Sequence, residues 1–496
     1  MAVRRVLLLC AIAGLLLATS CDSHRGLSER YRAEREFFVA DRAATRILKD
    51  SALRGAANAR ETIRLFDRLV AKFPQDALED GRMYSDTEAS ALKRIVWKSS
   101  VRAAGLVSLS GDGEEAARRY VAISERFGGD RELGSVSLYL GARAREATGE
   151  WDVSLQTYEE IVNGFLSGRW SVESFDQRLM EVPFLMARLI EVSPDGRTVG
   201  DVMEKGRAFY RWTGERSPEL ALYSRLSEAR TYAREGRWTR HVSMLRELLG
   251  SSQFAAEDVR PLVLLDVARA YAEGLQMPDS ALSYCSVLER DYPSHAATAH
   301  ALFIRASVLR ERGSLEEAKK ILQMLAGRRS DVSASAMLEL GALYESQGKW
   351  EDARAQYGSL RGFFPHSVHN YEALLRVITH YRESGDRAAM LRAADEAVQF
   401  LREEIATLPE SQAALVARGF LVDAHIIVGR TREAAEELEA IAGLYGNRAS
   451  GVLALLKAAR MHEEAGAREK ARQLLAEFEE RYGKTAIGER LESTIF

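Results

Sequence analysis

Apolar residues recur at helical spacing through most of the chain, and residues 334–367 show the pattern most clearly. Two apolar stripes there, with residues three or four positions apart, predict two consecutive amphipathic helices. The first stripe consists of Met337, Leu340, Gly341 and Tyr344, and the second of Trp350, Ala353, Tyr357 and Leu360. Because one such pair cannot bury its apolar face alone, the pattern predicts an array of helix pairs.

Glycine and proline set the ends of both predicted helices. Gly348 follows the first stripe, where a left-handed backbone conformation would end the helix. Phe364 and Pro365 end the second, because proline cannot continue a helix and restricts the residue before it. Gly341 lies inside the first stripe, where glycine costs roughly 1 kcal/mol relative to alanine. We therefore expect a partner helix to approach Gly341 closely.

This spacing resembles the tetratricopeptide repeat (TPR), whose period is about 34 residues. With Ala334 as the first position, the family pattern is met at Leu340, Gly341, Tyr344, Ala353, Tyr357 and Pro365. The resemblance implies an all-α fold, a right-handed α-solenoid of TPR-like helix-turn-helix repeats, and protein or peptide partners.

Further copies follow the same phase along the chain. A turn glycine with a small residue five places later marks Gly313 with Ala318, Gly429 with Ala434, and Gly466 with Ala471. Weaker copies lie at Gly111 with Ala116, Gly149 with Ser154, Gly236 with His241, and Gly385 with Met390. One more copy has Ala268 and Tyr271 before its turn, Cys285 after it, and an extra residue within it. The sequence thus predicts roughly ten helix pairs.

The repeat pattern divides the chain into segments. We predict N-terminal TPR-like repeats over residues 29–163, a divergent helical segment over 164–218 and C-terminal TPR repeats over 219–496. The divergent segment has an expected loop around 164–172, a helix with Pro183 at its start and a partner helix over 199–212. A second interruption around Pro409 lengthens one repeat. Insertions in solenoids often map to the binding face, but drift of the repeat explains both interruptions as well.

The amino terminus has the pattern of an export signal. Two arginines precede an apolar run over residues 6–18, which is shorter than the ~20 apolar residues of a transmembrane helix. The run ends in LATSC, which resembles the lipobox of bacterial lipoproteins and implies lipidation of Cys21. Ala18 departs from that pattern, in which leucine is preferred. We predict a lipoprotein signal peptide over 1–20 and a short tether over 21–28.

An ordinary signal peptide, cleaved after Ser20, is the alternative and would leave Cys21 as a free thiol. The other cysteines favour lipidation, because Cys10 leaves with the signal and Cys285 lies on an apolar helix face as a small core residue. We therefore expect an exported protein, lipid-anchored on the periplasmic side of a bacterial membrane. Asp22 resembles an inner-membrane retention signal of enteric bacteria, a rule that other bacteria follow poorly, so both membranes remain open.

Composition and motifs exclude several functions. The 496 residues carry 69 basic and 72 acidic side chains, and this formal net charge of −3 argues against a nucleic-acid-binding surface. The sequence has no P-loop, G-x-S-x-G or H-E-x-x-H motif, and we expect no cofactor or metal. His366 and His369 have no cysteine or carboxylate close behind them, which favours a surface loop over a metal site.

Lytic transglycosylases are the one enzyme class that the sequence requires us to consider. Periplasmic members carry long helical superhelices and a catalytic glutamate next to serine, a pair that Glu345 and Ser346 would supply. This pair lies at the end of a predicted helix, and the glycine-methionine-glutamine segment that follows it in that family is missing. The sequence favours a non-enzymatic protein.

The family resemblance also implies a peptide-binding groove lined by first helices. At the corresponding positions of three consecutive repeats we expect Phe303, Leu338 and Leu375 to form an apolar patch, with Arg310 and Arg382 beside it. A merely solvated inner face is the alternative. We expect a membrane-anchored TPR scaffold in a bacterial cell-envelope complex, for assembly or export of envelope components. A regulator or substrate-binding module for cell-wall synthesis or export is the alternative function.

Overall fold

The computed structural model describes residues 29–49, 56–148, 150–192, 198–251, 259–328, 330–407, 412–446 and 449–482. Every regular element within these ranges is a helix. The predicted signal peptide, Cys21 and the tether lie outside the described residues, as does the interruption around Pro409. The chain divides into two compact units, one up to Leu179 and one from Met180, and each is described by itself.

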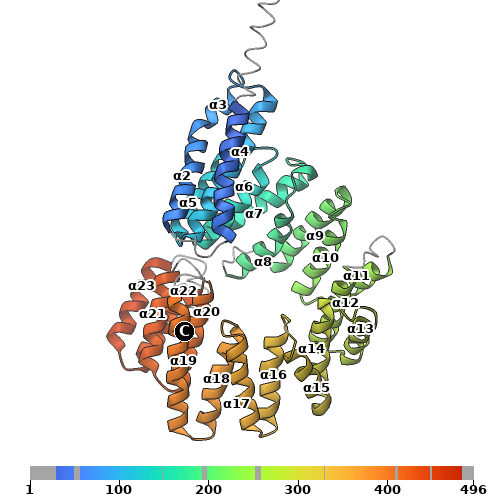
Figure 1. The fold of residues 1–496 in the computed structure, drawn as a ribbon, viewed down its shortest axis with the longest axis vertical. Coiled ribbons are helices and arrows are strands. Elements are labelled where there is room, and N and C mark those ends of the chain that lie inside the picture. The colour runs from blue at the N-terminus through green and yellow to red at the C-terminus, as the bar shows by residue number, and fades with distance from the viewer. Residues whose placement is uncertain are drawn as a thin grey trace, which may run out of the picture. The chain divides into compact units, whose positions relative to one another are not determined.

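The described part of unit 1 contains three helix pairs (Figure 1). In chain order its elements are the helix over residues 29–49, α2 (Ala56–Lys72), the short α3 (Gln75–Glu79), α4 (Asp86–Leu109), α5 (Gly113–Phe127), α6 (Gly134–Ala147) and α7 (Trp151–Leu166). Apolar stripes of neighbouring helices meet in its core, where Phe66, Leu69 and Leu92 are almost completely buried. Two 3-10 turns, η2 (Val172–Ser174) and η3 (Gln177–Glu181), follow α7.

A buried tryptophan lies in the segment that was expected to form a loop after α7. Trp170 is only 1% exposed, and its indole Nε1 donates a hydrogen bond of 3.3 Å to the carbonyl of Asp130. Its ring packs beside Phe165, with 5.5 Å between the ring centroids, and fills the space that a side chain at Gly164 would need. This part of the divergent segment therefore belongs to the core of unit 1.

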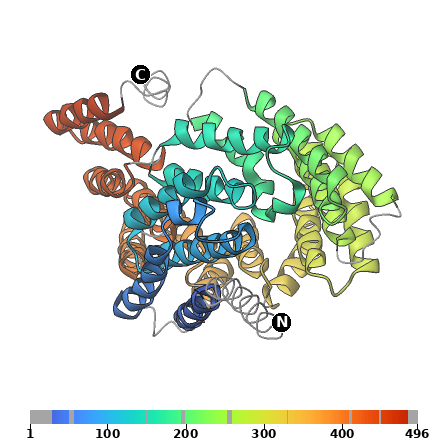
Figure 2. The same ribbon diagram turned by 90° about the horizontal axis from the view of Figure 1, so that it is seen from above.

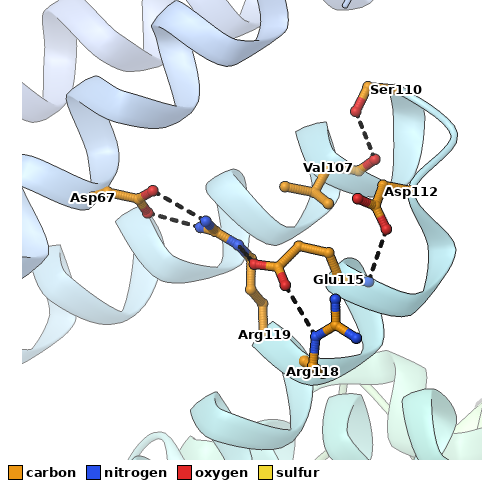
Figure 3. Close-up of polar contacts among 7 residues, drawn as sticks. All are labelled: Asp67, Val107, Ser110, Asp112, Glu115, Arg118 and Arg119. Atoms are coloured by element: carbon orange, nitrogen blue, oxygen red, sulfur yellow. Dashed lines mark hydrogen bonds and ion pairs between the residues drawn. The ribbon is translucent and has the colours of Figure 1, made fainter.

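An arginine links two helices on the surface of unit 1 (Figure 3). Arg119 on α5 donates to both carboxylate oxygens of Asp67 on α2, at 2.7 and 3.1 Å, and to Glu115 at 2.9 Å. Hydrogen bonds from Arg119 and Arg118 lower the pKa of Glu115. The ion pairs are partly exposed, so we assign them a stabilisation of only about 0–1 kcal/mol each.

In unit 2 the described residues form eight consecutive helix pairs, each packing on the next (Figures 1 and 2). The pairs are α8 (Val182–Val192) with α9 (Val199–Arg216), α10 (Ala221–Arg234) with α11 (Trp238–Gly250), α12 (Arg260–Arg269) with α13 (Pro278–Asp291), α14 (Ala296–Glu311) with α15 (Leu315–Ala326), α16 (Ser333–Ser346) with α17 (Trp350–Phe363), α18 (Val368–Glu383) with α19 (Arg387–Thr407), α20 (Gln412–Ile427) with α21 (Thr431–Tyr445), and α22 (Ala449–Glu464) with α23 (Arg468–Tyr482). The expected all-α repeat solenoid is confirmed, and α8 and α9 lie where the divergent segment predicts a helix pair.

The turn glycines have the left-handed conformation that the repeat predicts. Gly348 has φ 71°, and the N–H of the following Lys349 donates to the carbonyl of Tyr344 at 2.9 Å. This bond to a carbonyl five residues back closes the end of α16, as in a Schellman motif. The same positive φ occurs at Gly111, Gly236, Gly313, Gly385, Gly429 and Gly466. Gly149 lies outside the described residues.

The turn between α12 and α13 contains the extra residue that the sequence indicates. A π-helical turn over Ala270–Gly274 extends α12, and Gln276 adopts φ 51° in place of the usual glycine. The closing bond now spans six residues instead of five, from the N–H of Met277 to the carbonyl of Tyr271 at 2.7 Å. Cys285 on α13 is fully buried, which confirms the predicted core position and raises the pKa of its thiol to about 12.

Candidate partner-binding surfaces

The predicted patch lies on α14, α16 and α18, the first helices of three consecutive repeats. Phe303 and Leu375 are half-buried, whereas Arg310 and Arg382 are exposed. Leu338 is only 4% exposed and belongs to the core around α16, so the expected exposed patch of three apolar residues is wrong at this position. The reason is that α16 packs against α15, α17 and α18, which buries a wider face than its apolar stripe indicates.

Charged and polar side chains connect these first helices on a surface that we call the first-helix face. Arg310 on α14 lies 3.7 Å from Glu339 on α16. Between α16 and α18, Ser335 forms a 2.8 Å hydrogen bond with His369, and Arg376 lies 3.8 Å from Glu345. Together with Phe303, Leu375 and Arg382, these residues make a mixed surface of charges and partly exposed apolar groups.

Glu345, the candidate transglycosylase glutamate, belongs to this network. It accepts a 2.7 Å hydrogen bond from the hydroxyl of Tyr357, and His380 lies 3.9 Å away. Burial and this bond to Glu345 raise the pKa of Tyr357. Ser346 donates instead to the carbonyl of Leu343 in its own helix, at 2.8 Å. Each side chain of the pair thus has a structural partner within the repeat.

A second surface feature is an open pocket formed by α19, α20 and α21. Its volume is about 600 Å³. Side chains of both charges line it, together with a buried histidine: Asp395, Val398, Gln399, Arg402, Glu403, Ala406, His425, Arg430 and Glu433. One ion pair crosses its edge, with Arg430 donating to Asp395 at 2.7 Å. The pocket has room for a side chain or a chain segment of a partner.

His425 is the unusual group of this pocket. It is only 2% exposed, and neither ring nitrogen has a hydrogen-bond partner among the described residues. Burial lowers the pKa of His425, and the nearby Arg430 and Arg402 lower it further. A buried polar group without a partner costs about 1–3 kcal/mol, which a ligand able to reach a ring nitrogen would offset.

The histidine pocket was not predicted, although the sequence carries a signal for it. His425 stands four residues before the turn glycine Gly429, and His462 stands four residues before Gly466. In three other repeats this position holds tyrosine, at Tyr232, Tyr344 and Tyr381. A histidine at this core position of the repeat is therefore the sequence signal that indicates the pocket.

The buried histidines predict a loss of stability in acid. Burial lowers the folded-state pKa of both His425 and His241, so below pH ~6.5 the unfolded chain binds protons that the folded chain does not. We expect the urea midpoint to fall as the pH drops through this window. His425→Tyr, which restores the residue of other repeats, should make the fall shallower, whereas His366→Gln at an exposed site should not. Equal pH dependence in all three proteins would contradict this.

Two further observations limit the chemistry of the described residues. Within the ranges given above, no group of three or more histidine, cysteine, aspartate or glutamate side chains is placed to hold a metal ion. The helices in those same ranges also lack the combination of length and apolarity needed to cross a bilayer.

Comparison with known proteins identifies the repeat. Two solved structures resemble the chain weakly: a human IFIT1 dimer with PPP-AAAA, and Naa15/Naa10 bound to HypK-THB. The first is 13% identical over 77% of this chain and 84% of that chain, with a TM-score of 0.32. The second is 13% identical over 91% of this chain and 64% of that chain, with a TM-score of 0.29. No curated protein matches the chain.

The family match falls on the repeat that the hydrophobic pattern shows most clearly. The tetratricopeptide repeat model matches residues 335–367, which span α16 and α17, and again residues 453–485. The first of these ranges differs by one residue from the unit predicted to begin at Ala334. The chain therefore contains two segments that match the tetratricopeptide repeat.

Proposed function

We propose that this chain is a non-enzymatic scaffold that is anchored to a bacterial membrane through a lipid on Cys21 and binds protein partners of a cell-envelope complex. Tetratricopeptide repeats suggest a protein-interaction scaffold. The lipobox-like segment supports the anchor, and the apolar run before it supports export. Either membrane of the envelope is compatible with this proposal.

The observation that carries the proposal is the first-helix face of α14, α16 and α18. Arg310 and Arg382 are exposed there, and Phe303 and Leu375 pack against the core on one side while part of their apolar surface stays accessible. Aromatic and arginine side chains, here Phe303, Arg310 and Arg382, are residue types that are enriched at protein interfaces. The face therefore suits a protein partner better than a small molecule.

Photo-crosslinking at single positions tests the scaffold role in cells. We expect p-benzoylphenylalanine at Phe303 or Leu375 to give discrete crosslinked species, because these side chains would contact the partner. The same probe at Phe363, which is 68% exposed at the end of α17, should give none. Equal crosslinking at all three positions, or none at the first two, would contradict the assignment of the face. Peptidoglycan turnover that depends on Glu345 would overturn the non-enzymatic role.

A further inference from the structure

The first described helix, over residues 29–49, has one face packed into unit 1. Ala33, Ala40, Ala44 and Ile47 are each at most 4% exposed and pack against α2 and α4. Among the described residues, the opposite side of this helix is exposed, for example at Tyr31, Arg35 and Phe38.

All four acidic residues of this helix have partners within the described chain. Glu29 accepts a hydrogen bond from Tyr84 at 2.8 Å, and Arg30 donates to Glu34 at 2.8 Å. The remaining two pair with other helices: Lys72 lies 2.7 Å from Glu36, and Arg102 lies 2.8 Å from Asp41. Cations thus neutralise three of the four carboxylates locally, and three of the four carboxylates tie the helix to its neighbours.

The cations of the helix are distributed differently. Five of them are exposed and have no ion-pair partner among the residues that the structure describes: Arg32, Arg35, Arg42, Arg46 and Lys49. Since the described acidic residues of this helix pair with other groups, these five cations leave a local excess of positive charge on its exposed side. This local excess contrasts with the formal net charge of −3 for the whole chain.

Two large aromatic side chains lie along the same line as these cations. Tyr31, Arg35, Phe38, Arg42 and Lys49 follow one another at i, i+4, i+7, i+11 and i+18, so they share one side of the helix. Tyr31 is 66% exposed and Phe38 is 64% exposed. We call these five residues the basic stripe. It contains no acidic residue.

We propose that the basic stripe lies on the surface of an anionic phospholipid bilayer. Arginine and lysine would approach the lipid phosphates, while the rings of Tyr31 and Phe38 would enter the headgroup region, as in helices that lie in a membrane interface. That the stripe lies near a membrane rests on the lipid anchor of the proposed function. Only residues 22–28 separate Cys21 from this helix, a span of at most roughly 25 Å when extended.

The stripe gives the anchor a second point of contact. A lipid on Cys21 alone would fix the distance of the chain from the bilayer but not its orientation. A helix bound along the surface also fixes the orientation of unit 1, because its buried side is tied to α2 and α4 by packing and by ion pairs. The bilayer is thus the occupant whose charge and position both match the stripe.

Vesicle co-sedimentation tests the stripe separately from the lipid. The chain starting at residue 21 with Cys21→Ser retains every described residue and cannot be lipidated. It should bind phosphatidylglycerol vesicles but not phosphatidylcholine vesicles. The variant Arg35→Gln/Arg42→Gln/Lys49→Gln should bind phosphatidylglycerol about a hundredfold more weakly, since each cation near an anionic surface contributes roughly fivefold.

A control of equal net charge makes the result specific. Arg118→Gln/Arg432→Gln/Arg472→Gln removes three exposed arginines from other helices and should bind like the unsubstituted chain. Equal loss in both variants, or no binding of the parent chain to phosphatidylglycerol, would overturn the proposal. Palmitate labelling of the full chain, with Cys21→Ser as control, tests the anchor alone. If labelling fails while vesicle binding is intact, the proposed lipid anchor is contradicted and the proposed role of the basic stripe is supported.

Discussion

Replacing Gly341 with alanine should destabilise the protein by about 1–3 kcal/mol, although alanine is the better helix former. A methyl group on Gly341 would overlap the ring of Tyr357, which belongs to the partner helix α17. That ring cannot move freely, because Tyr357 is 3% exposed and its hydroxyl donates to Glu345 at 2.7 Å. The helix-propensity gain of roughly 1 kcal/mol for alanine is smaller than the expected overpacking cost.

The same substitution seventeen residues later should have the opposite sign. Gly358 lies next to Tyr357 on α17, but it is exposed, and no atom would come within 4 Å of a methyl group there. Gly358→Ala should therefore stabilise the protein by about 0.5–1 kcal/mol through helix propensity alone. The two variants make the same chemical change within one repeat and differ only in what surrounds it.

Urea unfolding followed by circular dichroism at 222 nm measures both effects. Because the stability of a repeat array depends on each unit and its neighbours, we expect Gly341→Ala to shift the transition to lower urea and Gly358→Ala to shift it to higher urea. The double variant Gly341→Ala/Tyr357→Leu should lose less stability than the separate effects predict, since the smaller side chain relieves the overlap. A stabilising Gly341→Ala would show that α16 and α17 are not in close contact at this position.

Features that depend on a single repeat could be predicted from the sequence. The apolar stripes, the turn glycines and the close approach at Gly341 follow from residues fewer than 40 positions apart, and the structure confirms them. The extra residue in the turn after Tyr271 could also be predicted, because the spacing between the two helices is one residue longer than in the other repeats. The spacing does not predict the conformation of this turn, which is π-helical and has Gln276 in a left-handed conformation.

Features that depend on contacts between repeats could not be predicted in this way. Leu338 is buried because helices of the neighbouring repeats pack on α16 in addition to its own partner α17. Trp170 is core because unit 1 has space for it beside Gly164 and Asp130, which no local pattern indicates. His425 lines a pocket made by three helices of two repeats. In each case the contacting residues belong to other helices or loops, and a periodic pattern does not predict where those elements lie.

Arg207→Met should cause the largest loss among the charged residues, about 3–5 kcal/mol, because it would leave a buried carboxylate without its main partner. Arg207 on α9 donates to Glu235 at 2.7 Å, and these side chains are only 9% and 11% exposed. The guanidinium also lies 4.7 Å from the ring centroid of Tyr232 and 3.3 Å from the hydroxyl of Thr231. This cluster ties the divergent pair α8–α9 to the regular repeat that begins with α10.

Arg237→Met provides the matched control for this prediction. Arg237 also contacts Glu235, at 3.3 Å, but its side chain is 58% exposed, so its removal should cost at most about 1 kcal/mol. Glu235→Gln combined with Arg207→Met should recover part of the loss, because no buried charge then remains unpaired. Near-equal effects of Arg207→Met and Arg237→Met in urea unfolding would contradict a special role for the buried pair.

Hydrogen exchange should locate the damage that Arg207→Met causes. Each repeat contacts only its neighbours, so lost stability appears first in the helices that share the broken contact. We expect faster amide exchange in α8, α9 and α10, while α22 and α23 keep the exchange rates of the unsubstituted chain. Uniformly faster exchange from α8 to α23 would instead mean that unit 2 unfolds as one cooperative body. The buried pair would then stabilise the whole array and not only the junction between its irregular and regular parts.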